Sequence, residues 1–573
     1  MDPASRLADD LAVSVVGETS DPLIAAALAE ARTPPAQGVA EPRKATAKMP
    51  AKLWREPSVW GLTTVAVVWT AWIYLQVWRR HDRFGTFDND LGFHSQYIWQ
   101  IAHGRWFSTI LGLHAFGHNS TFGYLLLAPL SWFGGGPHTW NFIQTASLAS
   151  GAFAVFSISR RRLGTPGLGA AMGVIWLLQP VVQGNAWETF HPESMAMAPL
   201  LFAYNAADQR RWRRFAAWAF LAIIWKADVA LFLAVLALVF AWKQRLRPKD
   251  LPAGWTGGRS RMQLRNARRP LAIFALSLVW FFVCMNVMIP RLSGGGTVFG
   301  GLYGRLGDSP SEVVINGLRH PTWIAERVGS NDAVKYGRDL LTPLALSALG
   351  GPEGLLIGLP QIGVSLLAER QFTHDPFGNP HYQALTATAL MIGSIEAMSR
   401  LRRRRPTALI PAIAIIAAFG LATTASWGAL PSGVRRNTFW VPPGDPSKTA
   451  KRAAVEFVGP DSVVSATYLL VPHLAEREGV YSFPNPWRQV FYGVVGTPPP
   501  NPRAVQFLIV DLQILSEGPD RELYDCLMTV GSFREASRGA KGQIIVSKRV
   551  QPTSEEQREQ FRLAEDQCAH PAG

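Results

Sequence analysis

The sequence predicts an α-helical polytopic membrane protein of about 11 transmembrane helices, followed by a small α/β domain. Uncharged apolar runs of about 20 residues recur as far as residue 427, and each is long enough to cross roughly 30 Å of hydrocarbon. Lys and Arg gather in short clusters between these runs. Beyond residue 428 the apolar runs stop and short strand-like segments begin.

The N-terminal segment and the basic clusters predict the topology. Residues 1–57 are rich in Ala and Pro and lack an apolar h-region, so we expect a disordered cytoplasmic tail. The transmembrane domain is expected at residues 58–428, oriented so that every basic cluster faces the cytoplasm. These clusters begin at Arg43, Arg160, Arg210, Lys243 and Arg400.

This orientation assigns each apolar run either to a membrane span or to the outer surface. The expected spans are 59–78, 139–159, 167–182, 194–207, two arms within 215–242 broken at 225–228, 271–290, two short arms within 340–367, 383–398 and 408–427. The run 121–133 contains Pro129 and is too short to cross, so we place it at the outer surface. The main outer loops are then 79–138 and 291–339.

The net charge of +15 is consistent with the alternation of apolar runs and basic clusters. In a soluble protein it would suggest a nucleic-acid partner. Here the basic residues lie between apolar runs, as in loops attracted to an anionic inner leaflet. We therefore predict no nucleic-acid partner.

The odd number of spans places residues 429–573 outside the cytoplasm, as a small α/β domain. Four strands are expected within 461–470, 479–484, 505–513 and 542–548, with helical segments between them. Cys526 and Cys568 would lie in an oxidising compartment and could pair, whereas Cys284 lies within a span and is expected only to pack.

Ionisable residues gather in the outer loops, close to the membrane, where they are costly unless paired, hydrated or used. They could line a shared cavity in which an acid serves as general base, metal ligand or acceptor for a sugar hydroxyl. They are Asp88, Asp90, His94, His114, His118, Glu188, His191, Glu193, Lys226, Asp228, His374, Asp375 and His381.

Structural roles remain open for several of these residues. Asp88 or Asp90 could cap the helix that begins near Leu91. His191 and Glu193 could belong to an interfacial turn, and Lys226 and Asp228 could form only a structural ion pair at a helix break.

A zinc site at His114 and His118 is disfavoured because Gly112 and Gly117 interrupt the helix that this spacing would need. The chain also lacks a credible Walker loop, GxSxG, HExxH or dinucleotide fingerprint.

Six motifs carry a family resemblance over roughly Gly85 to Pro486. They are "DLGFHSQYIWQIAHG", "HNSTFGYLLLAPL", "TFHPES", "WKADVALFL", "GNPHY" and "SVVSATYLLVPHLAEREGVYSFP". As a set they resemble the bacterial membrane family of domain of unknown function 2079. The first outer loop with its acid, the broken hairpin with its lysine and the C-terminal outer domain resemble the GT-C glycosyltransferases.

The resemblance implies an inverting glycosyltransferase in the bacterial cytoplasmic (inner) membrane. Its donor would be a polyprenyl-phosphate-linked sugar and its acceptor a cell-envelope glycan or lipid. The first-loop acid of GT-C enzymes, a general base or metal ligand, matches Asp90 best, with Asp88 as its neighbour. A divalent ion, Mg or Mn, would then lie on Asp90. The family's Lys-Glu-Asp is Lys226-Ala227-Asp228 here, which removes one acid.

We expect the remaining motif residues to bind substrate. They are His94, Gln96, His118, Glu188, His191, Glu193, Lys226, Asp228, His381 and Tyr382.

Two other functions remain open. A lipid or glycolipid transporter or flippase would also use broken hairpins and ions within the membrane, although the polar groups lie on one side and no inverted repeat is evident. A non-catalytic envelope-assembly protein would use the C-terminal domain to bind a partner.

Overall fold

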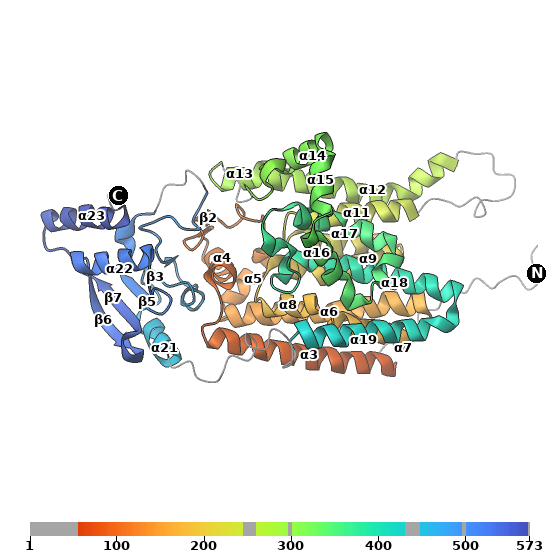
Figure 1. The fold of residues 1–573 in the computed structure, drawn as a ribbon, viewed down its shortest axis with the longest axis horizontal. Coiled ribbons are helices and arrows are strands. Elements are labelled where there is room, and N and C mark those ends of the chain that lie inside the picture. Colours follow the sequence, from red (N-terminus) through yellow and green to blue (C-terminus); the bar gives the residue numbers. More distant parts are fainter. Residues whose placement is uncertain (1–55, 244–258, 296–300, 430–446, 495–499, 571–573) are drawn as a thin grey trace, which may run out of the picture. The chain divides into compact units, whose positions relative to one another are not determined.

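The computed structural model describes residues 56–243, 259–295, 301–429, 447–494 and 500–570. All of the described residues belong to one compact unit. The expected disordered tail, 1–57, lies outside the described residues except for its last two positions. Figure 1 shows a helical region that fills most of the described chain and a five-stranded sheet in the C-terminal part; β1 (Phe107–Ser108) and β2 (Leu113–His114) of the first loop form a separate two-stranded sheet.

Four described helical segments are long and apolar enough to cross a membrane. They are α3 (Pro57–Asp82), α6 (Pro137–Leu163), the segment Ala267–Leu292 and the segment Pro406–Trp427. The third comprises most of α12 (Arg259–Val283) with η4 (Cys284–Met288) and α13 (Ile289–Leu292), and the fourth comprises η10 (Pro406–Ala408) and α19 (Leu409–Trp427).

A fifth span is possible as a bent pair, α7 (Pro166–Leu177) and α8 (Pro180–Trp187), which meet at 50°. The bend precedes Pro180, as expected because proline disfavours helical backbone in the residue before it.

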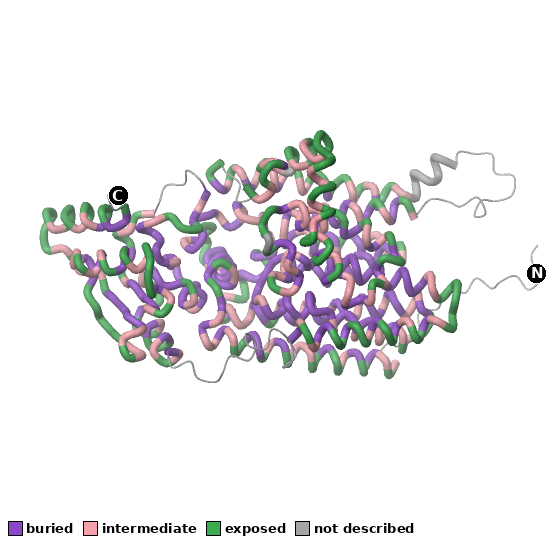
Figure 2. Tube along the Cα trace, in the orientation of Figure 1, coloured by how far each residue is buried: buried purple, intermediate pink, exposed green. Residues whose placement is uncertain are grey.

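Other helices occupy the remaining expected spans. They are α9 (Pro192–Asp208), α10 (Trp212–Ile223), α11 (Val229–Lys243), α17 (Pro352–Leu367) and α18 (Ala384–Arg404). Helices α8, α9 and α18 are buried along most of their length (Figure 2), which is why polar residues on them need partners inside the protein. The count of about 11 spans remains a prediction.

Ion pairs join several of these helices at one end, which we name the basic end. Arg162 at the end of α6 contacts Asp208 at the end of α9 at 2.5 Å and Glu396 of α18 at 3.0 Å. Lys243, the last residue of α11, reaches Glu396 at 3.5 Å. The C-termini of α6, α9, α11 and α18 therefore meet, as the predicted topology requires.

One expected span takes a different form. Two short helical arms were expected within 340–367, but only the second, α17, is an α-helix. The first is replaced by the short turns η6 (Thr342–Leu344) and η7 (Ser347–Gly350). Between these turns, Ala345 and Leu346 have φ angles of 49° and 59°, a left-handed conformation that ends a right-handed helix.

The loops between the helices contain short elements. The first loop holds η2 (Asp88–Gly92), α4 (Phe93–Ala102), β1 (Phe107–Ser108), β2 (Leu113–His114) and α5 (Tyr124–Ser131). The later loops hold η5 (Gly304–Leu306), α14 (Pro310–Arg319), α15 (Pro321–Val328), α16 (Asn331–Leu341), η8 (Gln371–His374) and η9 (Pro380–Gln383). Helix α5, within the run 121–133, has eight residues and is too short to cross a membrane.

The C-terminal part contains a five-stranded sheet in the order β4-β3-β5-β7-β6. The strands are β3 (Val464–Ala466), β4 (Val480–Ser482), β5 (Phe507–Asp511), β6 (Phe533–Gly539) and β7 (Ile544–Arg549). Strand β3 pairs in parallel with β4 and β5, whereas β7 pairs antiparallel with β5 and β6. The accompanying elements are α21 (Lys448–Phe457), η11 (Val471–His473), η12 (Pro502–Ala504), α22 (Pro519–Val530), η13 (Ala540–Gly542) and α23 (Glu555–Ala569).

The four expected strands are confirmed, and the sequence reasoning missed β6. Only Phe533 of β6 is buried, so its pattern is too polar to predict a strand. The disulfide between Cys526 of α22 and Cys568 of α23 is confirmed, with a Cα separation of 5.7 Å. Cys284 is a free, buried cysteine, as expected.

Candidate functional site

Asp90 lies in the single turn η2, between the end of α3 and the start of α4. Its Oδ1 is 3.3 Å from Nε2 of His191, and its side chain keeps 35% exposure. Asp88 points elsewhere and accepts a hydrogen bond from Ser482 of β4. The N-cap positions of η2 and α4 are Phe87 and Gly92, so neither acid is the N-cap residue of these helices.

His191 is held by a polar residue of α6. Gln144 donates from Nε2 to the carbonyl of Asn185 at 2.7 Å and to the carbonyl of Thr189, and its Oε1 accepts from the backbone N–H of His191 at 2.6 Å. Thr189 has a φ of 79°, an unfavourable conformation for a β-branched residue. The buried amide of Gln144 therefore fixes a strained turn that presents His191.

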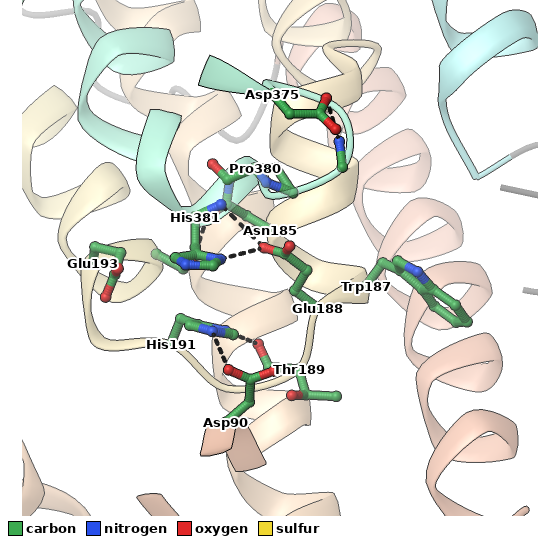
Figure 3. A network of polar contacts seen from close by, with 12 residues as sticks. Asp90, Asn185, Trp187, Glu188, Thr189, His191, Glu193, Asp375, Pro380 and His381 are labelled. Atoms are coloured by element: carbon green, nitrogen blue, oxygen red, sulfur yellow. Dashed lines mark hydrogen bonds and ion pairs between the residues drawn. The ribbon is translucent and has the colours of Figure 1, made fainter. Parts of the chain in front are cut away.

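His381 approaches His191 from η9. Its backbone N–H and its Nδ1 lie 3.0 and 2.9 Å from Oε2 of Glu188. The rings of His191 and His381 stack with centroids 4.4 Å apart. Asn185 fixes the turn by donating to the carbonyl of Pro380 at 2.9 Å. Figure 3 shows His191 between Asp90 and the pair formed by Glu188 and His381.

Lys226 lies in the break between α10 and α11 and is largely buried. Its Nζ is 3.0 Å from Oε1 of Glu193 and 3.7 Å from Oδ2 of Asp228. Burial opposes the charge, but the carboxylates of Asp228 and Glu193 raise the pKa of Lys226. Burial, together with the charge of Lys226, lowers the pKa of His118 to about 4. Lys226 therefore remains a cation beside a neutral His118.

The charges of Asp90 and His191 support one another. Burial would lower the pKa of His191, but the hydrogen bond and charge of Asp90 raise it to about 9. Burial likewise opposes ionisation of Asp90, and the same contact holds the pKa of Asp90 below its usual value. Both nitrogens of His191 have partners, because Nδ1 also lies 3.3 Å from the carbonyl of Thr189.

The cluster is rich in carboxyl groups. Asp90, Glu188, Glu193 and Asp228 supply four carboxylates. They face the ammonium group of Lys226 and the imidazole rings of His191 and His381. An excess of negative charge in a confined site favours a bound cation.

Glu188, His191 and His381 offer ligand atoms that lie within 4.8 Å of one another. Two imidazoles and a carboxylate suit a divalent transition ion such as Zn²⁺ or Mn²⁺ better than Mg²⁺, which prefers oxygen ligands. The sequence suggested Asp90 as a metal ligand. Asp90 is not one of these three residues and contacts them only through His191.

Some predicted site residues lie next to this cluster and others do not. His94 is buried, shares a hydrogen bond of 2.5 Å between its Nδ1 and the Tyr124 hydroxyl, and its ring lies 6.0 Å from that of His191. The Tyr382 ring lies 4.1 Å from that of His381. Gln96 is buried elsewhere and orders the following loop, through hydrogen bonds with Thr109 at 2.8 Å and the backbone of Ile110 at 3.1 Å.

Other outer-loop residues are engaged away from the cluster. His374 accepts from Arg327 at 2.9 Å, and Asp375 accepts from the backbone of Gly378 within its own turn at 2.8 Å. Arg105 and Arg305, further basic residues of the outer loops, pair with Glu478 and Glu326 at the protein surface.

Sequence reasoning missed Gln144, Asn185 and Tyr303. Gln144 had a usable signal, since an amide within an apolar span is costly unless it has a partner. Tyr303 lies in a glycine-rich loop and interacts electrostatically with Lys226 and Asp228, and burial raises its pKa to about 12. Only the fold brings that loop to the cluster.

Comparisons with known proteins agree with the architecture. The fold is similar to that of ArnT from Cupriavidus metallidurans in the apo state, with a TM-score of 0.50, 12% identity, and coverage of 86% of this chain and 98% of that chain. The structure of the same ArnT bound to undecaprenyl phosphate matches with a TM-score of 0.48, 12% identity and the same coverage. ArnT is a GT-C glycosyltransferase, so the predicted GT-C resemblance is confirmed for the fold.

A search of curated proteins gives no significant match. The family described as "Predicted membrane protein (DUF2079)" matches residues 80–509, which is most of the chain and includes every residue of the cluster. The protein is therefore a member of the DUF2079 family of predicted membrane proteins.

Proposed function

We propose that this protein is a glycosyltransferase that moves a sugar from a polyprenyl-phosphate donor to a cell-envelope acceptor. The observation that carries the proposal is the contact of Asp90 with His191, beside Lys226, in an ArnT-like fold. The ArnT structure bound to undecaprenyl phosphate supports the choice of a polyprenyl lipid.

In the proposed reaction an acceptor hydroxyl attacks the anomeric carbon of the donor sugar. Its proton passes to the carboxylate of Asp90 as the new glycosidic bond forms, and the bond between the anomeric carbon and the phosphate oxygen breaks. Attack from the face opposite the phosphate inverts the anomeric configuration. His191 orients Asp90 and favours its ionised form.

The leaving polyprenyl phosphate needs cations more than it needs an acid. Lys226 supplies one charge, and Glu193 and Asp228 hold it in place. Because the cluster is otherwise negative, an anionic donor would be repelled without further positive charge. We propose that Glu188, His191 and His381 hold a divalent ion near the phosphate; His191 would release its proton to bind the ion, which would then supply the positive charge beside Asp90.

The proposed topology has about 11 crossings, with the basic end in the cytoplasm and the cluster at the outer face of a bacterial inner membrane. The meeting of helix C-termini at the basic end supports it. The C-terminal α/β part contacts the first loop, where Gln100 donates to the carbonyl of Glu478 at 2.8 Å. It would therefore share the outer side with Asp90.

The direct test uses the purified full-length chain in lipid nanodiscs. It is offered a panel of undecaprenyl-phosphate-linked monosaccharides together with envelope extract as acceptor, with and without added Mn²⁺ or Zn²⁺. Mass spectrometry should show release of undecaprenyl phosphate together with a glycosylated acceptor. Movement of the intact lipid-linked sugar across a liposome membrane, without cleavage, would instead identify a flippase and reject the proposal.

A further inference from the structure

A groove lies between α10 and α12, at the opposite end of α10 from the Asp90 cluster. It is distinct from a larger cleft of about 780 Å³, which lies in the C-terminal part beside α23. The groove between α10 and α12 measures about 610 Å³. Its walls combine apolar side chains, Trp212 and Ile273 among them, with arginines.

Among the described residues, four arginines and no acidic residue line this groove. Three of them, Arg213, Arg214 and Arg269, are exposed and form no hydrogen bond or ion pair with any described residue. The first turn of α10 also contains no acid. A concentration of positive charge without a protein partner favours an anionic ligand.

The groove continues into apolar surface on both helices. Phe220 of α10 is 66% exposed and Leu276 of α12 is 67% exposed. Each lies six or seven residues further along its helix than the nearest of the three arginines, which corresponds to about 10 Å. A ligand with an anionic head and long apolar tails matches this combination, because the head would meet the arginines while the tails follow the helices.

We propose that the groove between α10 and α12 binds an anionic glycerophospholipid of the bilayer, with its phosphate held by Arg213, Arg214 and Arg269. Basic pockets between transmembrane helices are suited to such head groups. Arginine suits phosphate because its planar guanidinium donates two parallel hydrogen bonds. The proposal does not depend on the glycosyltransferase activity.

The test compares two triple variants that remove the same charge. The first is Arg213→Gln, Arg214→Gln and Arg269→Gln. The control is Arg403→Gln, Arg404→Gln and Arg405→Gln, at the C-terminal end of α18, which lies outside the groove. Native mass spectrometry of the full-length chain measures the binding of dioleoyl phosphatidylglycerol and of dioleoyl phosphatidylcholine, while circular dichroism and gel filtration check the fold.

The groove variant should bind phosphatidylglycerol about 100-fold more weakly, from the usual contribution of three basic residues at a membrane surface. The control should change by less than about threefold, and neither variant should affect phosphatidylcholine. An equal loss in both variants would mean diffuse attraction and would overturn the proposal, as would no loss in the groove variant. Displacement of phosphatidylglycerol by an equimolar amount of undecaprenyl phosphate would also reject it, by assigning the groove to the polyprenyl lipid.

Discussion

Replacing Asp90 with asparagine removes a proton acceptor with little change in shape. The carboxylate lies 3.3 Å from Nε2 of His191, and the amide oxygen of asparagine can occupy the same position. His191 would keep its contact with the carbonyl of Thr189, so the turn should remain in place. General-base catalysis contributes about 100-fold to 10,000-fold, or roughly 3–5 kcal/mol of the activation barrier. We expect the rate of transfer to fall by at least about 100-fold.

The assay measures single-turnover transfer from an undecaprenyl-phosphate-linked sugar by the purified variant in nanodiscs. Asp88→Asn is the matched control, because Asp88 is only two residues away but points to Ser482. It should retain activity within about threefold. Undiminished transfer by Asp90→Asn, or an equal loss in Asp88→Asn, would refute the assignment of Asp90 as the base. A fall in donor affinity at constant rate would show that Asp90 only binds substrate.

Three further predictions concern a cation, a metal and a disulfide. Lys226→Gln should weaken the binding of undecaprenyl phosphate by about tenfold or more, since a charged hydrogen bond is lost. The control Arg305→Gln should have no effect. Equal affinities of the two variants for undecaprenyl phosphate in native mass spectrometry would contradict this prediction. His381→Ala should reduce the affinity for Mn²⁺ or Zn²⁺ at least about tenfold in isothermal titration calorimetry. His374→Ala is the control. Unchanged metal binding by His381→Ala would exclude the proposed ligand set. Cys568→Ser should destabilise the C-terminal part by about 2–4 kcal/mol, seen as a lower unfolding midpoint in limited proteolysis, and an unchanged midpoint would count against a stabilising role.

The sequence alone determined the elements whose physical signal is local. Long uncharged runs are costly to expose to water, so α3, α6 and α19 were predictable as apolar helices. Basic clusters mark the helix ends that meet at Arg162 and Lys243. The strands that alternate or are fully apolar were also predictable, whereas β6 was not, because its exposed residues have no hydrophobic period.

Tertiary structure decided which of the outer-loop residues form a site. Asp90, His191 and His381 are brought together from three segments whose order in the chain does not predict their contact. Both Asp88 and Asp90 were candidates in the sequence, and only the family resemblance favoured Asp90. Residues two apart on a helical turn face different directions, so only Asp90 reaches His191. The partner of a polar side chain depends on packing between distant segments, and that information is absent from any local pattern.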